Sequence, residues 1–141
     1  SNTAARRRAG TARQLLPVRP MSQARQALGR SGEDLACVEL ERRGYAVLAR
    51  RYRRRGGEID IIARDGETTV FVEVKARSGP GYGAGGEAVG RVKQRRMAAI
   101  ALDFLARHRL TAAPCRFDVV VIDVSGPAPK IELYQNAFGV E

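Results

Sequence analysis

The residues 57-GEIDIIARDGETTVFVEVKAR-77 decide the fold, because they hold two apolar runs on either side of Asp65-Gly66. Asp-Gly between alternating hydrophobic segments is a strong signal for a two-residue β-hairpin turn. Runs rich in Val, Ile, Thr and Phe are typical of strands. The stretch therefore predicts two antiparallel neighbours, at 58–64 and 67–76.

Patterns on both sides of this hairpin extend it into a larger domain. A helix is predicted upstream, where no proline interrupts residues 22–43 and Gly44 follows. Apolar residues from Val89 to Leu105 recur at helical spacing and predict a second helix that ends near Arg109. The remaining strands are predicted at 45–52, 116–124 and 130–138.

The order of the predicted elements is α-β-β-β-α-β-β. The strands that flank the second helix form a βαβ unit if they run parallel, whereas the hairpin strands are antiparallel. The sheet is therefore expected to be mixed. A mixed sheet flanked by two helices is an α/β layered domain.

Positive charge is spread unevenly along the 141 residues. Lys and Arg number 25 against 15 acids, which gives a net charge of +10. Residues 1–20 hold five arginines and no acid, half of this excess. We predict a disordered basic tail at 1–21 and one domain at 22–141. The charge favours a nucleic acid partner. No apolar stretch is long enough to span a membrane, so we expect no membrane partner and a cytoplasmic protein.

Cysteine and histidine are too few for several common kinds of site. The chain has two cysteines, Cys37 and Cys115, and one histidine, His108. A structural zinc site needs about four such ligands. A Ser-His-Asp or Cys-His mechanism would depend entirely on His108. The composition therefore argues against both chemistries.

Acidic residues within the hairpin strands are costly to bury without a partner. If Arg64 lies opposite Glu67 across the turn, Asp60 lies opposite Phe71 and Glu58 lies opposite Glu73. Cross-strand partners share a face, and side chains alternate along each strand. The spacing therefore places Glu58, Asp60, Phe71, Glu73 and Lys75 on one face, and Ile59, Ile61, Val72 and Val74 on the other.

Carboxylates gathered on one face repel each other, and a divalent cation removes that repulsion. Oxygen ligands without imidazole suit a hard ion such as Mg²⁺ or Mn²⁺. Lys75 reaches the same space as Glu73 and can hold a phosphate or orient a water molecule. A metal ion with a lysine beside it is suited to phosphodiester hydrolysis.

Spaced motifs along residues 27–122 carry a family resemblance. They are GRSGE at 29–33, GEID at 57–60, FVEVKAR at 71–77, a lysine at 93 and RFDVV at 116–120. An acid on one strand followed by E-x-K on the next resembles the PD-(D/E)xK nuclease superfamily. More narrowly, the chain resembles the YraN family of small bacterial predicted endonucleases, itself similar to archaeal Holliday-junction resolvases. Two positions depart from the pattern: Ile59 replaces the proline of the superfamily name, and Arg51 stands where asparagine is expected.

The resemblance implies a restriction-endonuclease-like fold with a Mg²⁺ or Mn²⁺ ion that activates water. It makes Asp60 and Glu73 metal ligands, Glu33 on the first helix a further acidic ligand, and Lys75 the catalytic lysine. Junction resolvases act as dimers, so the resemblance also implies a homodimer.

Basic residues cluster just before the acidic strands. Contacts of such residues with phosphate give affinity and salt dependence without sequence preference. We expect DNA rather than RNA as the partner. The residues expected to bind it are Arg50, Arg51, Arg53, Arg54, Arg55, Arg77 and Lys93.

Several of these residues also have a structural interpretation. The acids of the hairpin can form an inert ion network with neighbouring arginines. Glu33 can be an ordinary helix acid paired with arginines. Glu58 can bind metal or pair with an arginine, and Lys93 can serve the site or lay its stem along the sheet.

Taken alone, the sequence supports a Mg²⁺-dependent endonuclease that hydrolyses DNA, with branched or damaged DNA as candidate substrates. One alternative is a nucleic-acid-binding accessory protein of recombination or repair with weak or no catalysis. A second is an RNA-associated basic protein with structural carboxylates, which predicts no binding of divalent ions.

Overall fold

The computed structural model describes residues 21–77 and 89–139, and the tail predicted at 1–21 lies almost wholly outside this range. The element order matches the predicted α-β-β-β-α-β-β. None of the helices in the described residues is long and apolar enough to cross a membrane. The elements are α2 (Met21–Arg42), β1 (Ala46–Arg54), β2 (Gly57–Asp65), β3 (Thr68–Arg77), α3 (Arg91–Arg107), β4 (Cys115–Asp123) and β5 (Lys130–Phe138).

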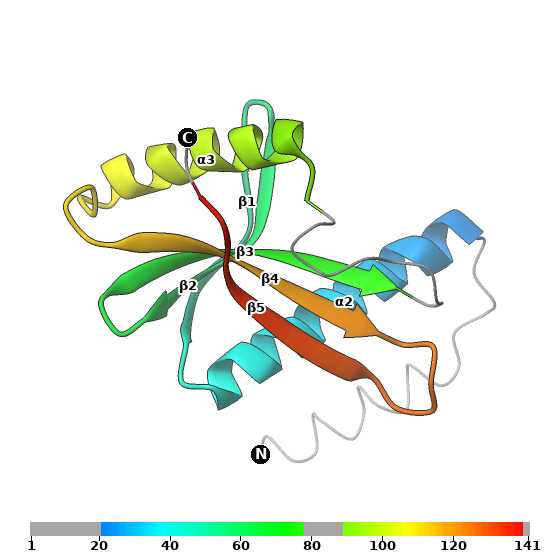
Figure 1. Ribbon diagram of the computed structural model, residues 1–141. Helices are drawn as coiled ribbons and strands as arrows, with labels where there is room; N and C mark the ends of the chain where they lie inside the picture. The colour runs from blue at the N-terminus through cyan, green and yellow to red at the C-terminus, as the bar shows by residue number, and fades with distance from the viewer. Residues whose placement is uncertain (1–20, 78–88, 140–141) are drawn as a thin grey trace, which may run out of the picture.

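The strands form one mixed sheet in the order β1-β2-β3-β4-β5. All neighbours are antiparallel except β3 and β4, which are parallel and joined through α3. This is the βαβ unit expected from the sequence, and it confirms the mixed sheet and the α/β class. Figure 1 shows the twisted sheet between α3 and α2.

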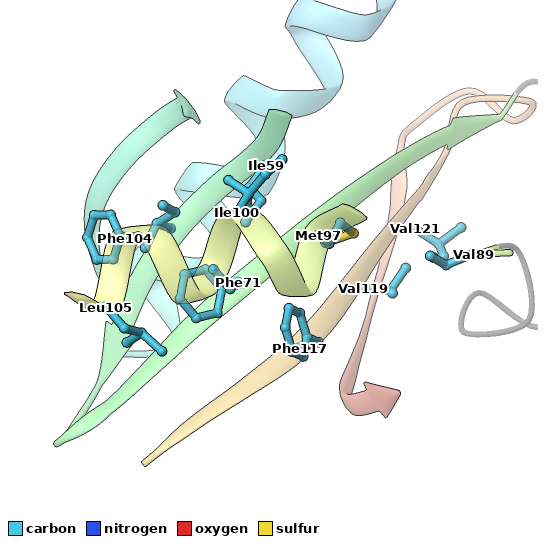
Figure 2. Close-up of a cluster of buried hydrophobic side chains, with 12 residues drawn as sticks. Ile59, Phe71, Val89, Met97, Ile100, Phe104, Leu105, Phe117, Val119 and Val121 are labelled. Atoms are coloured by element: carbon cyan, nitrogen blue, oxygen red, sulfur yellow. The ribbon is translucent and has the colours of Figure 1, made fainter. Parts of the chain in front are cut away.

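The two helices cover opposite faces of the sheet, because alternate strand residues point to opposite sides. The face under α3 includes Phe71 and Phe117, which pack with Phe104 of that helix (Figure 2). The other face includes Val72 and packs with Leu40 of α2. The strands β3 and β4 are therefore buried on both sides, which explains their nearly continuous apolar sequence.

Gly32 lets α2 approach the end of β3 closely. A Cβ atom at this position would lie 3.3 Å from Cβ of Ala76, closer than most real contacts. This agrees with the close approach that a glycine inside a helix suggests. The neighbouring residue Glu33 is held near the sheet by the same packing.

The register predicted for the hairpin is wrong by two residues. Asp65 pairs with Thr68, so Gly66 and Glu67 form the turn. Gly66 has a φ of 60°, which glycine adopts without cost. Arg116 of β4 donates a 2.8 Å hydrogen bond to Asp65 Oδ2, which holds Asp65 in the strand.

The corrected register changes the predicted partners. Phe71 lies opposite Ile62 rather than Asp60, and Glu58 pairs with Arg53 of β1 rather than Glu73. Because the shift is by two residues, it keeps most side chains on their predicted faces. Phe71 packs under α3, whereas Val72 packs under α2.

The predicted face is wrong for Ile59, where β2 departs from simple alternation. Ile59 and Ile62 both pack under α3, although an odd spacing of three positions should put them on opposite faces. Regular alternation is lost at Asp60, and the β1–β2 ladder has no Arg51–Asp60 pair between Arg50–Ile61 and Tyr52–Ile59. Arg51 has a φ of 50°, a left-handed conformation that asparagine adopts more readily than arginine. The left-handed backbone at position 51 therefore explains why asparagine is expected there.

Asp118 of β4 links this strand to β5 and to Tyr45, the residue before β1. It is fully buried and accepts hydrogen bonds from the Tyr45 hydroxyl (3.0 Å), Arg116 Nε (3.0 Å) and the Asn136 amide (2.9 Å). All three donors lose a partner if this carboxylate is removed. The network is therefore structural.

Replacing Asp118 with alanine is expected to lower the free energy of unfolding by about 3 kcal/mol, because it leaves a charged, partly buried Arg116 without its main partner. Urea unfolding followed by circular dichroism measures the change. Asp123→Ala on the same strand is the control, since Asp123 accepts its hydrogen bonds from Ser125, two residues away. Equal losses in both variants would contradict the assignment.

Candidate active site

Asp60 and Glu73 meet where β2 and β3 stop pairing. The ladder between the two strands ends at Ile61 and Val72. Two residues beyond Val72, the Val74 amide donates a 2.8 Å hydrogen bond to Oδ2 of Asp60, the residue next to Ile61. The separation of the strands therefore admits a carboxylate side chain between them.

Glu73 is a buried carboxylate with two lysines beside it. Its side chain is 1% exposed. Lys93 of α3 contacts Oε2, and Nζ of Lys75 lies 3.6 Å from the same atom. The other oxygen, Oε1, is buried and has no hydrogen-bond partner among the described residues. The two lysines stay partly exposed, so their ammonium groups border on solvent.

The proximity of the two carboxyl groups changes the acidity of Asp60. Burial, the charge of Glu73 and a hydrogen bond with Glu73 together raise the pKa of Asp60 from 3.8 to about 8. The Val74 amide and Lys93 act in the opposite direction, but more weakly. Without a cation, the pair is therefore most stable when it holds a proton.

The chemistry of this pair fits a divalent cation. Asp60 and Glu73 offer oxygen ligands, and Oε1 of Glu73 lacks a donor in the described protein. A cation would satisfy that oxygen and remove the repulsion that now raises the pKa of Asp60. Mg²⁺ commonly binds through only one or two carboxylates and keeps several water molecules.

Glu33 is not brought into contact with the other two acids. Oε1 lies 3.0 Å from Arg51 Nε and 3.6 Å from Arg50 Nη2. The side chain is only 14% exposed. Within residues 21–77 and 89–139, no group of three or more Cys, His, Asp or Glu side chains is arranged to hold a metal ion. A role of Glu33 as a third ligand stays a prediction.

Glu58 also lies apart from the carboxyl pair. Arg53 Nε donates a 2.8 Å hydrogen bond to its side chain across the β1–β2 hairpin. Of the two interpretations left open for Glu58, the structure matches the one in which it pairs with an arginine.

Most arginines of β1 already have acidic partners. Arg50 contacts Asp34 at 2.7 Å. Arg54 contacts Asp103 of α3 at 2.9 Å and also lies over the ring of Tyr52. Arg55 is exposed in the turn that follows β1, beside a hollow of about 320 Å³ between this turn and α3. Arg77 is the last residue of β3, two positions beyond Lys75.

Sequence reasoning missed one group of the site, the main-chain amide of Val74. Its role depends on the separation of β2 from β3, and a backbone donor has no residue type that could reveal it. The contact between Lys93 and Glu73 was foreseen only as one of two alternatives.

A search of solved structures found a distant likeness to SfsA of Pyrococcus furiosus in complex with Ca²⁺. The match covers 78% of this chain and 63% of that chain, with 15% identity and a TM-score of 0.36. A score this low assigns neither a shared fold nor a shared activity.

Sequence comparisons identify much closer relatives. A UPF0102 protein of Geobacter metallireducens is 51% identical over 118 residues, which cover 84% of this chain and 97% of the relative. One of Geobacter sulfurreducens is 48% identical over 124 residues, with 87% and 97% covered. The model of the uncharacterised protein family UPF0102 matches residues 32–122. The YraN resemblance is to this same family. The chain therefore belongs to the UPF0102 family.

Proposed function

We propose that this protein is a metal-dependent nuclease that hydrolyses a phosphodiester bond in DNA. One observation carries the proposal: the buried carboxyl pair of Asp60 and Glu73, with two lysines at its solvent side. Bringing two acids together destabilises a fold unless a bound cation or a proton compensates it. Such strain is typical of functional sites.

The residues of the pair have distinct roles in this proposal. Asp60 and Glu73 hold Mg²⁺ or Mn²⁺, which supplies a water molecule of lowered pKa and neutralises charge on the phosphate. The Val74 amide fixes the orientation of Asp60. Lys75 faces the same site from β3 and holds a phosphate oxygen or orients the attacking water. A homodimer and a contribution of Glu33 stay predictions.

The proposal predicts cleavage that requires a divalent ion. Linear, flapped and four-way DNA substrates are incubated with the full chain in Mg²⁺, in Mn²⁺ or in EDTA, and products are resolved by electrophoresis. We expect cleavage of at least one substrate with metal and none in EDTA. Glu73→Gln should lose that cleavage, whereas Glu132→Gln on exposed β5 should keep it.

The same panel separates the nuclease from its alternatives. A binding-only accessory protein would bind DNA but leave every substrate intact under all conditions. Isothermal titration with Mg²⁺ and Mn²⁺ provides an independent readout. Failure of the wild-type protein to bind either ion would refute the proposed function.

A further inference from the structure

The N-terminal half of α3 carries an unusual density of positive charge. Four of the six residues 91–96 are cationic. The helix has no acid in its first turn, and no side chain caps Gly90 at its N-terminus. Its one acidic residue, Asp103, lies in the other half and already accepts hydrogen bonds from β1.

Three of these cations have no partner among the residues that the structure describes. They are exposed, and no ion pair or hydrogen bond is formed by Arg91, Arg95 or Arg96 there. Arg91 and Arg95 are four residues apart, so they lie on one side of the helix, where like charges cost roughly 0.2–0.5 kcal/mol. The helix tolerates this repulsion with no acid to relieve it.

Arg91 and Arg95 also border a hollow in the surface. Its volume is about 310 Å³, within the usual size range of ligand sites. Among the described residues, those that line it are Arg91, Gln94, Arg95, Ala98 and Gly139. It provides a concave place where an anionic group contacts two guanidinium groups at once.

This basic helix face adjoins the candidate active site. Lys93, in the first turns of the same helix, faces the sheet and contacts Glu73, whereas Arg91 and Arg95, each two positions away, lie on the outer side of the helix. Arg96 is three residues from Lys93 and therefore lies on the same side of the helix, so the basic surface continues from the outer arginines toward the carboxyl pair. By contrast, Arg50, Arg53 and Arg54 of β1 are held by acids of this chain.

We propose that Arg91, Arg95 and Arg96 form the surface that binds the phosphate backbone of double-stranded DNA beside the active site. The choice of DNA rests on the proposed function. Duplex is favoured over single strands because the large hydrophobic side chains exposed in the described chain are aliphatic, not aromatic. Proteins that bind single strands stack bases on exposed aromatic rings.

The proposal is tested by DNA affinity measured without divalent ions. Fluorescence anisotropy with a labelled DNA duplex in EDTA compares the wild type with the variant R91A/R95A/R96A. We expect R91A/R95A/R96A to bind at least about tenfold more weakly than the wild type. The slope of log affinity against log salt concentration should be shallower by about two to three. The variant with lysine at all three positions should keep most of the affinity, because lysine also contacts phosphate as a point charge.

A matched control removes the same charge elsewhere. R42A/R43A/R64A lowers the net charge equally, at two residues that pair with Glu39 at the end of α2 and at one exposed residue of β2. It should change affinity less than about threefold. Equal losses of DNA affinity in both alanine triple variants would contradict the proposed binding surface. An unchanged affinity of R91A/R95A/R96A would contradict it as well. Tighter binding of an RNA duplex than of DNA would overturn the choice of partner.

The test remains distinct from that of the nuclease. Binding in EDTA does not depend on cleavage, so DNA binding without cleavage in Mg²⁺ or Mn²⁺ refutes only the proposed function. Conversely, metal-dependent cleavage with full affinity in R91A/R95A/R96A refutes only the surface. Circular dichroism of each variant confirms that it is folded.

Discussion

Replacing Asp60 with asparagine is expected to lower DNA cleavage at least roughly 1,000-fold, because it removes a metal ligand whose charge offsets that of the ion. Asparagine keeps an oxygen that can accept the Val74 amide hydrogen bond. The fold should therefore persist. Mg²⁺ should raise the melting temperature of the wild type, since an ion that binds the folded state stabilises it, and should not raise that of the variant.

Without metal, the Asp60→Asn substitution is expected to stabilise the folded protein at high pH. The pKa of Asp60 rises from 3.8 in its ordinary range to about 8 in the folded protein. Between these values the folded state holds more protons than the unfolded state, so the free energy of unfolding falls as pH rises. The stability that the protonated Asp60 side chain contributes is complete below pH 3.8 and is lost as the pH rises through about 8.

Thermal unfolding in EDTA at about pH 6 and about pH 9 measures this linkage. The wild type should lose more stability than Asp60→Asn between the two values, and the variant should be the more stable protein at the higher pH. Glu67→Gln, in the exposed hairpin turn, is the charge control and should resemble the wild type. Parallel pH profiles for the wild type and Asp60→Asn would show that the two carboxyl groups do not interact.

The site was predictable from sequence to the extent that it depends on strand alternation. Alternation placed Glu73 and Lys75 on one face despite a wrong register, because a shift of two residues preserves the face. Asp60 instead lies where regular alternation is lost and where β2 separates from β3. The register itself depended on Asp65, which stays in the strand through its bond to Arg116. Arg116 is 51 residues away in sequence, so no local turn signal contains that information.

Glu33 and Ile59 show where local patterns stop being sufficient. The family resemblance implied a role for Glu33 at the site, and its side chain is mostly buried. Its partners, however, depend on how α2 crosses β1, which the sequence pattern leaves open. Ile59 changes face because the backbone departs from regular alternation at Arg51 and Asp60. Such departures are concentrated at functional sites, where sequence rules fail most often.

Replacing Lys75 with alanine is expected to slow cleavage by about 10²- to 10⁴-fold, the range typical of a positioned acid or base. DNA affinity should stay within about threefold, because one phosphate contact at most is lost. Stability should change little, since Glu73 keeps its contact with Lys93. Single-turnover cleavage and anisotropy measure the two effects separately, and Lys130→Ala on exposed β5 is the control.

The second lysine makes this prediction sharper. If Lys75 and Lys93 served only to neutralise Glu73, either one would suffice, and each single alanine variant would retain most of its activity. The double variant alone would then lose stability, by roughly 3–5 kcal/mol for an unpaired buried charge. If Lys75 acts on the substrate, its single variant loses activity although Lys93 still pairs with Glu73. Activity close to that of the wild type in Lys75→Ala would therefore assign both lysines to charge balance and contradict a catalytic role.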